Sequence, residues 1–197
     1  MTLKVGINGF GRIGRMILRS IIEQNRKDLE VVAINNRSNA ETSSFLLIND
    51  TVHGKLKSKI NHSEKAINID EKKINMIQEN EISKIDWKKY KVNIVLECTG
   101  KFNTKEKSSQ HINSGANKVI VSAPCKGAKN IIFGVNEKNL KSSDRVISAA
   151  SCTTNCLAPV AQVLNEEFGI ERGFMTTIHS YTCLLYTSPS PRDQRGS

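Results

Sequence analysis

Short apolar runs alternate along most of the chain with segments that are apolar on one helical face. Ile13, Met16, Ile17 and Ile21 recur at helical spacing and predict a helix over residues 12–24. Further helices are predicted at Ala40–Ile48, 105–113 and Cys152–Phe168. The predicted strands are Leu3–Asn8, Leu29–Asn35, 92–97, 118–122, 131–133, 146–149 and 172–181.

The order of these elements predicts the fold class. Strands that alternate with helices favour an α/β fold with a doubly wound parallel sheet, the Rossmann arrangement. Residues 56–79 alternate weakly between polar and apolar positions and contain turn-like segments at 61–64 and 70–73, which predicts a small antiparallel meander.

A glycine motif joins the first strand to the first helix. Gly9, Gly11 and Gly14 fit the pattern G-x-G-x-x-G, and the strand before and helix after them are the context that the motif requires. The glycines permit a tight turn, and the helix start offers free N–H groups to a pyrophosphate. The alternative is a purely structural glycine turn. We expect dinucleotide binding here.

The second strand ends without the acidic residue that usually binds the adenosine ribose. Asn35, Asn36 and Arg37 stand there. Asn36 can hydrogen-bond a ribose without repelling a 2′-phosphate, and Arg37 can pair with that phosphate. The hypothesis is NAD use with relaxed choice or a leaning towards NADP. The alternative is that Arg37 points into solvent and NAD remains preferred.

Cys152 stands at the predicted start of a helix, after Ser151. A thiol in the first helical turn feels the positive end of the helix dipole, which favours the thiolate. The neighbouring amides can stabilise an oxyanion. The alternative is an inert buried thiol with Ser151 acting only as a helix cap, and spacing alone leaves both open. Cys156, one turn later, is expected to face the core or the underside of the helix and to be a poorer nucleophile.

His179 adds a candidate base in a polar segment late in the last predicted strand. An imidazole can take a thiol proton and later pass one to a substrate oxygen. Spacing does not establish that it meets Cys152, and a lone histidine is usually structural. His53, His62 and His111 stand in loop-like or exposed contexts and are assigned no chemistry.

Composition narrows the possible partners. The 197 residues carry 29 Lys and Arg against 19 Asp and Glu, a net charge of +10. The lysines are scattered without interleaved aromatic residues, so nucleic-acid binding is not expected. No apolar run is long enough to cross a membrane, no signal peptide precedes the first strand, and the five cysteines lack metal-site spacing. We expect a cytoplasmic protein without metal or membrane.

Seven segments together resemble the phosphorylating glyceraldehyde-3-phosphate dehydrogenase family. They appear in the family's order through residue 182, and SCTTNCLAP is highly specific. The segments are VGINGFGRIGR at 5–15, LLINDTVHGKL at 46–56, ECTGKF at 97–102, KVIVSAP at 118–124, GVN at 134–136, SAASCTTNCLAP at 148–159 and TTIHSYT at 176–182.

The resemblance implies a reaction. Cys152 attacks the aldehyde of glyceraldehyde 3-phosphate, His179 assists proton transfer, hydride passes to the nicotinamide, and inorganic phosphate cleaves the thioester to give 1,3-bisphosphoglycerate. Ser151 and Thr153 match positions that hold the attacking phosphate, and Thr182 matches one that holds the substrate phosphate. The implied cofactor-binding positions are Gly9, Gly11, Arg12, Ile13, Gly14, Asn36 and Ser122.

The resemblance also predicts the domain organisation. Residues 1–151 are expected to form the NAD(P)-binding domain, and residues 152–182 the start of an incomplete α+β catalytic domain. Residues 183–197 contain no Lys, Asn or Ile and resemble translated adapter or vector sequence; a genuine disordered tail is the alternative.

Two positions depart from the family pattern, and the sequence leaves alternative functions to be considered. Asn36 replaces the usual Asp, and Asn80 stands where an Arg near the adenine is common. The parent is expected to be a homotetramer. A dehydrogenase of erythrose 4-phosphate, and an inactive cofactor-binding fragment for these 197 residues, are the alternatives. A basic nucleic-acid-binding module is supported by net charge alone.

Overall fold

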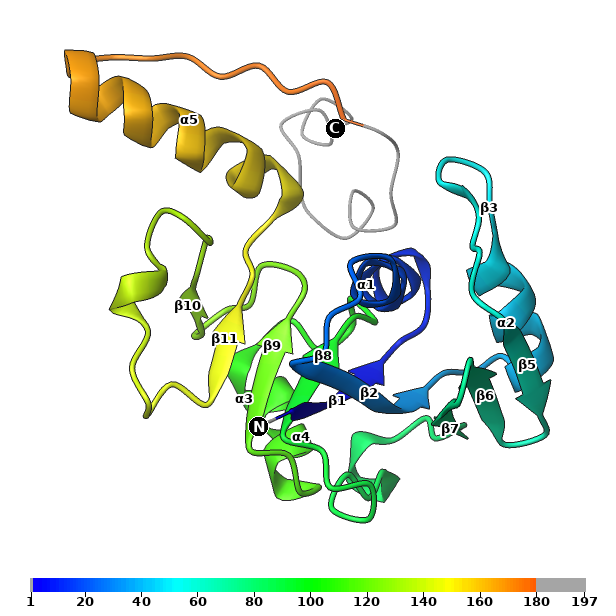
Figure 1. Ribbon diagram of the computed structural model, residues 1–197. Coiled ribbons are helices and arrows are strands. Elements are labelled where there is room, and N and C mark those ends of the chain that lie inside the picture. Colours follow the sequence, from blue (N-terminus) through cyan, green and yellow to red (C-terminus); the bar gives the residue numbers. More distant parts are fainter. Residues whose placement is uncertain (1, 180–197) are drawn as a thin grey trace, which may run out of the picture.

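A nine-stranded sheet organises the chain in the computed structural model, which describes residues 2–179 (Figure 1). Its strands are β1 (Leu3–Asn8), β2 (Leu29–Asn35), β5 (Ile60–Ser63), β6 (Ala66–Ile69), β7 (Lys72–Ile77), β8 (Ile94–Glu97), β9 (Lys118–Val121), β10 (Lys129–Asn130) and β11 (Val146–Ser148). A separate hairpin pairs β3 (Asn49–Asp50) with β4 (Gly54–Lys55). The helices are α1 (Arg12–Glu23), α2 (Ala40–Ile48), α3 (Lys105–Ser108), α4 (Gln110–Asn113) and α5 (Cys152–Phe168), with 3₁₀ turns at Ile82–Lys84 and Glu137–Asn139.

The sheet order identifies the doubly wound arrangement. Neighbouring strands follow the order β10-β11-β9-β8-β1-β2-β7-β6-β5, and pairing is parallel from β10 to β7. Successive connections therefore run one way from β1 through β2 to β7, and the other way from β8 onwards. The switch lies between β1 and β8, where ligands of such folds bind at the carboxyl ends of the strands. The predicted fold class is confirmed.

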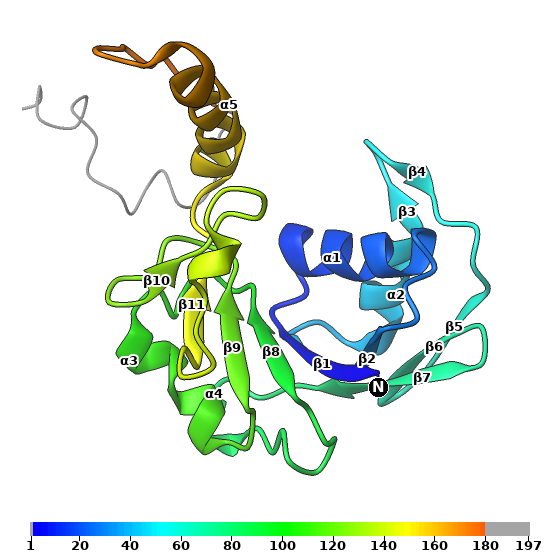
Figure 2. The same ribbon diagram turned by 60° about the vertical axis from the view of Figure 1, so that its left-hand side comes forward.

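Helices cover both faces of this sheet. Figure 2 shows α1 and α2 on one side of it and α3 and α4 on the other. Ile7, Leu18 and Ile34 belong to one buried cluster, and Trp87 and Val95 to another. The central strands are therefore buried on both faces, which explains their nearly continuous apolar sequences.

α5 differs from the other helices in its surroundings. It leaves the end of β11 and extends away from the sheet in both views (Figures 1 and 2). None of its residues is buried, and Leu157, Val160, Leu164 and Phe168 are exposed. Of the two positions expected for Cys156, the core is wrong, because the residue lies exposed on this helix.

Three predicted elements need correction. The helix at 105–113 divides at Ser109, where α3 ends and α4 begins. The Ser109 hydroxyl and the Ser109 amide both donate to the carbonyl of Lys105, a side-chain bond that adds to the helical one. Residues 131–133 form no strand, because the Ile132 amide donates to the Asn136 side chain within a turn; the strand is β10 instead.

The third correction concerns residues 172–181, predicted as a long strand. The described part, through His179, has no assigned secondary structure, and Phe174 and Ile178 are fully exposed. A strand needs a neighbouring strand to bond its amides, and no strand in the described range pairs with this segment.

The predicted meander at 56–79 is largely confirmed. β6 pairs antiparallel with β5 on one side and with β7 on the other. β7 also pairs in parallel with β2 and so joins the meander to the main sheet. Among residues 2–179, no helix has the length and apolar character needed to cross a membrane.

Candidate active site

The turn between β1 and α1 has the geometry that the glycine motif predicts. Gly9 has a φ of +92°, and a Cβ there would lie 2.8 Å from the Thr99 amide nitrogen. A Cβ on Gly14 would lie 2.2 Å from the carbonyl oxygen of Gly9, whereas one on Gly11 would meet nothing within 4 Å. Two of the glycines therefore allow close backbone packing, and the third leaves open space at the helix start.

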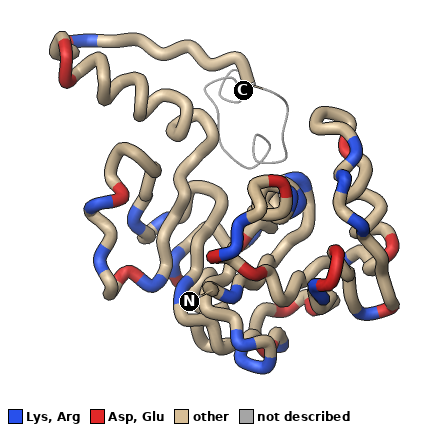
Figure 3. The backbone as a smooth tube through the Cα atoms, viewed as in Figure 1, with Lys and Arg blue, Asp and Glu red and all other residues tan. Residues whose placement is uncertain are grey.

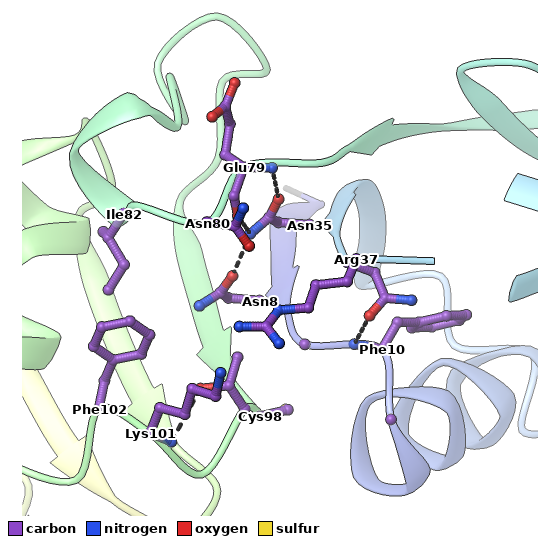
Figure 4. A pocket seen from close by; sticks show the side chains of 14 residues that line it. Asn8, Phe10, Asn35, Arg37, Glu79, Asn80, Ile82, Cys98, Lys101 and Phe102 are labelled. Atoms are coloured by element: carbon purple, nitrogen blue, oxygen red, sulfur yellow. Dashed lines mark hydrogen bonds between the residues drawn. The ribbon is translucent and has the colours of Figure 1, made fainter. Parts of the chain in front are cut away.

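A pocket opens beside this turn at the switch between β1 and β8 (Figure 4). It is lined by Asn8, Gly9, Phe10, Gly11, Asn35, Asn36, Arg37, Glu79, Asn80, Ile82, Cys98, Thr99, Lys101 and Phe102. The guanidinium of Arg37 extends into the pocket (Figure 4). The carboxyl ends of β1, β2 and β8 all contribute to the lining.

The turn and pocket fit a dinucleotide. α1 has no acidic residue in its first turn, and its cap residue Gly11 carries no side chain. The free amides of that turn and the positive dipole end favour a pyrophosphate. The space at Gly11 allows the close approach, so the residues present agree with the predicted ligand class.

Asn36 lies in the lining, but both ends of its side chain are engaged. Its oxygen accepts a bond from the Phe10 amide at 3.4 Å, and its nitrogen donates to Ser43 at 3.3 Å. The side chain that replaces the usual carboxylate thus braces the glycine turn. Arg37 and Lys101 supply positive charge to the same pocket.

Other predicted cofactor residues lie outside the lining. Arg12 pairs with Asp50 of the β3–β4 hairpin, and Ile13 is 48% exposed. Gly14 is buried beneath the turn. Ser122 follows β9, and its hydroxyl bonds the thiol of Cys98.

Cys152 and His179 lie together at the start of α5. The Cys152 Sγ is 3.2 Å from the His179 Nε2. The hydrogen bond with His179 is the main cause that lowers the pKa of the Cys152 thiol; the charge of that ring and the Thr153 amide act in the same direction, against a smaller effect of burial. The thiol is exposed, so it combines access with stabilisation of the thiolate.

Cys98 provides a contrast within the same chain. Burial raises the pKa of its thiol to about 12, although the hydroxyl of Ser122 acts in the opposite direction. Burial also raises the pKa of Cys125. Among these three thiols, only Cys152 has the environment of a nucleophile.

Hydroxyl side chains stand next to Cys152 in the first turn of α5. The Ser151 Oγ accepts the Thr154 amide at 3.0 Å and caps α5, and it lies 2.9 Å from the Thr153 Oγ1. Capping and chemistry are therefore compatible rather than alternative roles for this segment. Thr182, the other predicted substrate-binding residue, lies outside the described residues, as does the 183–197 segment.

Sequence reasoning missed two features. Ala150 has a φ of +58°, a strained backbone for a residue other than glycine, and it immediately precedes the cap of α5. The sequence places His111 in a loop-like or exposed context, yet its side chain is fully buried against Glu97 and Trp87. The available signal was weak: residues 105–113 contain only one apolar side chain, Ile112, next to His111, and the preceding strand ends in Glu97. His53 and His62 are exposed, as expected.

Among the residues that the structure describes, no group of three or more His, Cys, Asp or Glu side chains is placed to hold a metal ion.

Comparison with known proteins gives two family matches. Residues 3–105 match the glyceraldehyde 3-phosphate dehydrogenase NAD binding domain, and residues 151–195 match the C-terminal domain of the same family. The second match extends into the 183–197 segment, whose foreign origin stays a prediction.

Relatives named glyceraldehyde-3-phosphate dehydrogenase agree. The protein of Cereibacter sphaeroides is 49% identical over 183 residues, covering 92% of this chain and 54% of its own length. That of Coccidioides posadasii is 44% identical over 199 residues, covering 100% and 58%, and that of Thermotoga maritima is 46% identical over 180 residues, covering 91% and 54%. The chain spans about half the length of the curated relatives it matches, and it belongs to the glyceraldehyde 3-phosphate dehydrogenase family.

Proposed function

We propose that this chain carries the cofactor pocket and the nucleophile of an enzyme that oxidises glyceraldehyde 3-phosphate with NAD and phosphate to 1,3-bisphosphoglycerate. The observation that supports this most strongly is the 3.2 Å contact between Cys152 and His179 at a helix start. A dinucleotide pocket in the same chain supports the redox half of the reaction.

In this proposal Cys152 is the nucleophile and His179 its base. The imidazole takes the thiol proton, and the sulfur forms a bond to the aldehyde carbon as the C=O π bond opens. The imidazolium returns that proton to the former carbonyl oxygen, which gives a hemithioacetal and leaves His179 neutral. His179 then accepts the hydroxyl proton as the carbon loses hydride, which leaves a thioester on Cys152. Bound NAD supplies the hydride acceptor. Inorganic phosphate attacks the thioester carbon, the C–S bond breaks, and the thiolate is regenerated.

The hydroxyl groups at the start of α5 have a proposed role in holding phosphate. Ser151 and Thr153 lie 2.9 Å apart through their hydroxyl oxygens, beside the free amides of the first turn. We assign these two residues to the attacking phosphate, and Thr182 to the phosphate of the substrate. Their placement beside Cys152 in sequence brings the attacking group to the thioester.

Cofactor-binding roles for Gly9, Gly11, Arg12, Ile13, Gly14, Asn36 and Ser122 belong to the same proposal. The open space at Gly11 and the first-turn amides support a place for the pyrophosphate. Arg12 needs to leave Asp50 before it can contact a ligand with its side chain. Its backbone amide, like that of Ile13, needs no such change.

NAD is the cofactor of the matched domain, and we further propose that this chain accepts NADP. The pocket carries the cations Arg37 and Lys101, and no carboxylate stands at Asn36 to repel a 2′-phosphate. Measured dissociation constants that differ by less than about tenfold between the two cofactors would support this. A strong preference for NAD would reject it.

Erythrose 4-phosphate is a second possible substrate of this reaction type. The relatives above carry the glyceraldehyde name, which favours the first substrate. Cytoplasmic location and homotetramer assembly complete the proposal for the whole protein.

The 197 residues by themselves are proposed to bind cofactor without turnover. α5 has no buried residue, and its apolar side chains are exposed, so the wall that would complete the substrate site is absent from the described structure. Acyl phosphate formation tests both proposals, the activity of the complete gene product and the inactivity of the 197 residues alone. We expect product from the chain within its complete gene product and none from the 197 residues. Product from the 197 residues would overturn the second part, and no product from either would overturn the first.

A further inference from the structure

Beneath the pocket lies a buried polar group that the proposed reaction does not use. The side chains of Glu97, at the end of β8, and His111, in α4, are both 0% exposed. The His111 Nε2 is 3.0 Å from the Glu97 Oε2, and the His111 Nδ1 is 3.0 Å from the Trp87 Nε1. A buried carboxylate and imidazole need complete hydrogen bonding to be tolerated there.

Trp87 determines which nitrogen of His111 carries the proton. The indole N–H is a donor only, so the His111 Nδ1 must be the acceptor and carry no proton. The proton of a neutral ring is then on Nε2, where it donates to Glu97. A doubly protonated ring would place two N–H groups against each other at the Trp87 contact. The geometry therefore holds His111 neutral as its Nε2–H tautomer.

Glu97 occupies a site that offers it only donors. One carboxylate oxygen accepts from His111 and from the Asn8 amide at 2.6 Å. The other accepts from the Thr99 backbone amide at 2.7 Å and from the Thr99 hydroxyl. A carboxylate satisfies all four donors, whereas a carboxamide must turn its NH₂ group towards one pair of them. The site therefore calls for an ionised acid.

These bonds reach the pocket wall directly. Thr99 and Cys98 line the pocket, and the Thr99 amide packs so closely on Gly9 that a Cβ there would lie 2.8 Å away. Asn8, also in the lining, accepts from the Asn35 side chain at 2.7 Å. Glu97 thus fixes one wall and, through Asn8, the ends of two neighbouring strands.

Asn35 extends the chain of bonds to the far side of the pocket. Its nitrogen donates to the Glu79 carbonyl at 2.9 Å, and its oxygen accepts the Glu79 amide at 2.8 Å (Figure 4). Opposite walls of the pocket are therefore connected by hydrogen bonds through Asn8 and Asn35.

We propose that Glu97 and His111 are positioning residues for the dinucleotide pocket, acting as an ionised acceptor and a neutral Nε2–H donor that Trp87 fixes in that tautomer. This inference relies on the proposed function for the identity of the ligand. Neither residue contacts the ligand in this proposal; both act by holding Thr99 and Asn8.

The protonation half of the proposal is tested without ligand. Long-range ¹H–¹⁵N correlation spectra of the unmodified 197-residue chain at neutral pH report the protonation of each histidine nitrogen. We expect His111 to show an unprotonated Nδ1 and a protonated Nε2. A protonated Nδ1, in a neutral or cationic ring, would overturn the proposal.

The positioning half uses a matched pair of variants at His111. His111→Gln keeps an acceptor for Trp87 and a donor for Glu97, whereas His111→Met keeps neither. We expect NAD binding, measured by calorimetry, to weaken by less than about threefold in the first and by roughly tenfold or more in the second. Equal losses of NAD affinity in both variants would overturn the proposal. The affinity would then not depend on the acceptor for Trp87 and the donor to Glu97.

Glu97→Gln tests the acceptor directly. We expect NAD binding to weaken by about tenfold or more, with cooperative thermal unfolding as the check that the variant folds. Binding equal to that of the unmodified chain would contradict the role of Glu97. If this variant does not fold, the His111 pair still decides the question.

A result without ligand separates this proposal from the proposed function. Hydrogen exchange of the Thr99 amide is expected to be slow in the unmodified chain and in His111→Gln, and at least tenfold faster in His111→Met. Slow exchange in all three would refute the positioning role. Absence of NAD binding by the unmodified chain, with the exchange result as expected, would contradict the proposed function alone.

Discussion

Replacing His179 by Asn tests the local cause of Cys152 reactivity. The substitution removes the group that contributes most to the lowered pKa of the Cys152 thiol. The thiolate is then populated only at higher pH, and alkylation by iodoacetamide, which requires the thiolate, slows at neutral pH.

The magnitude follows from the distance and the exposure of the pair. Two unit charges separated by about the observed 3.2 Å attract by about 1 kcal/mol in a water-like dielectric. The higher dielectric is appropriate because Cys152 is exposed, and salt reduces the effect further. We therefore expect alkylation of Cys152 at neutral pH to slow by roughly three- to tenfold in His179→Asn.

The pH profile gives the sign. A lowered pKa keeps the thiolate populated until the pH falls through that value, so the unmodified chain should reach its maximal rate at lower pH than the variant. The two rates should converge at about pH 9 and above, where an ordinary thiol is ionised. Site-resolved mass spectrometry measures the rates.

Two other cysteines serve as controls in the same sample. Cys156, exposed on the same helix, should react at the same rate in both proteins. Cys98 should stay unlabelled while the chain is folded, because burial raises the pKa of its thiol to about 12. Equal Cys152 rates in the two proteins at neutral pH would refute the reasoning, and labelling of Cys98 would show that the variant had unfolded.

Three further predictions concern the pocket and the helix start. Asn36→Asp should weaken NADP binding by at least about tenfold relative to NAD, by calorimetry, because the carboxylate repels a 2′-phosphate; an unchanged ratio would contradict this. Gly14→Ala should lower the free energy of unfolding by about 2 kcal/mol or more, because its Cβ would lie 2.2 Å from a carbonyl oxygen. Gly11→Ala, whose Cβ meets nothing within 4 Å, should keep the melting temperature of the unmodified chain but bind NAD more weakly. Equal melting temperatures for the two variants would refute this difference. Ser151→Ala should cost about 1 kcal/mol of helix stability and accelerate hydrogen exchange of the first-turn amides of α5, and unchanged exchange would argue against the cap.

The sequence predicts the fold well where local and long-range preferences agree. Buried parallel strands have continuous apolar runs, so β1 and β2 begin and end where the pattern indicates. α2 and α5 likewise match their predicted ranges, and each begins after a capping side chain, Asn39 and Ser151 respectively. Local capping chemistry thus defines helix starts independently of the surrounding fold.

Prediction fails where structure depends on partners that local sequence does not contain. The residue types at 172–179 are compatible with a strand, but no described strand lies beside this segment to accept its hydrogen bonds. His111 appears polar in the sequence and is nevertheless buried, because Glu97 and Trp87, distant in sequence, satisfy both of its nitrogens. The hydrogen bonds that allow this histidine to be buried arise only from tertiary contacts.

The candidate site likewise has one part that the sequence predicts and one part that it does not. The glycine turn is predictable because its backbone demands are local, and Gly9 and Gly11 both line the pocket. The contact of Cys152 with His179 joins residues 27 positions apart in sequence, and only the structure places the two atoms within hydrogen-bonding distance.

Covalent trapping of the acyl intermediate tests the central claim most directly. The chain, within its complete gene product, is incubated with glyceraldehyde 3-phosphate and NAD without phosphate, and the site of acylation is found by mass spectrometry. We predict a 3-phosphoglyceroyl group on Cys152, retained in Cys156→Ser and released on addition of phosphate. Acylation at Cys156, or reduction of NAD with no adduct on Cys152, would contradict the account.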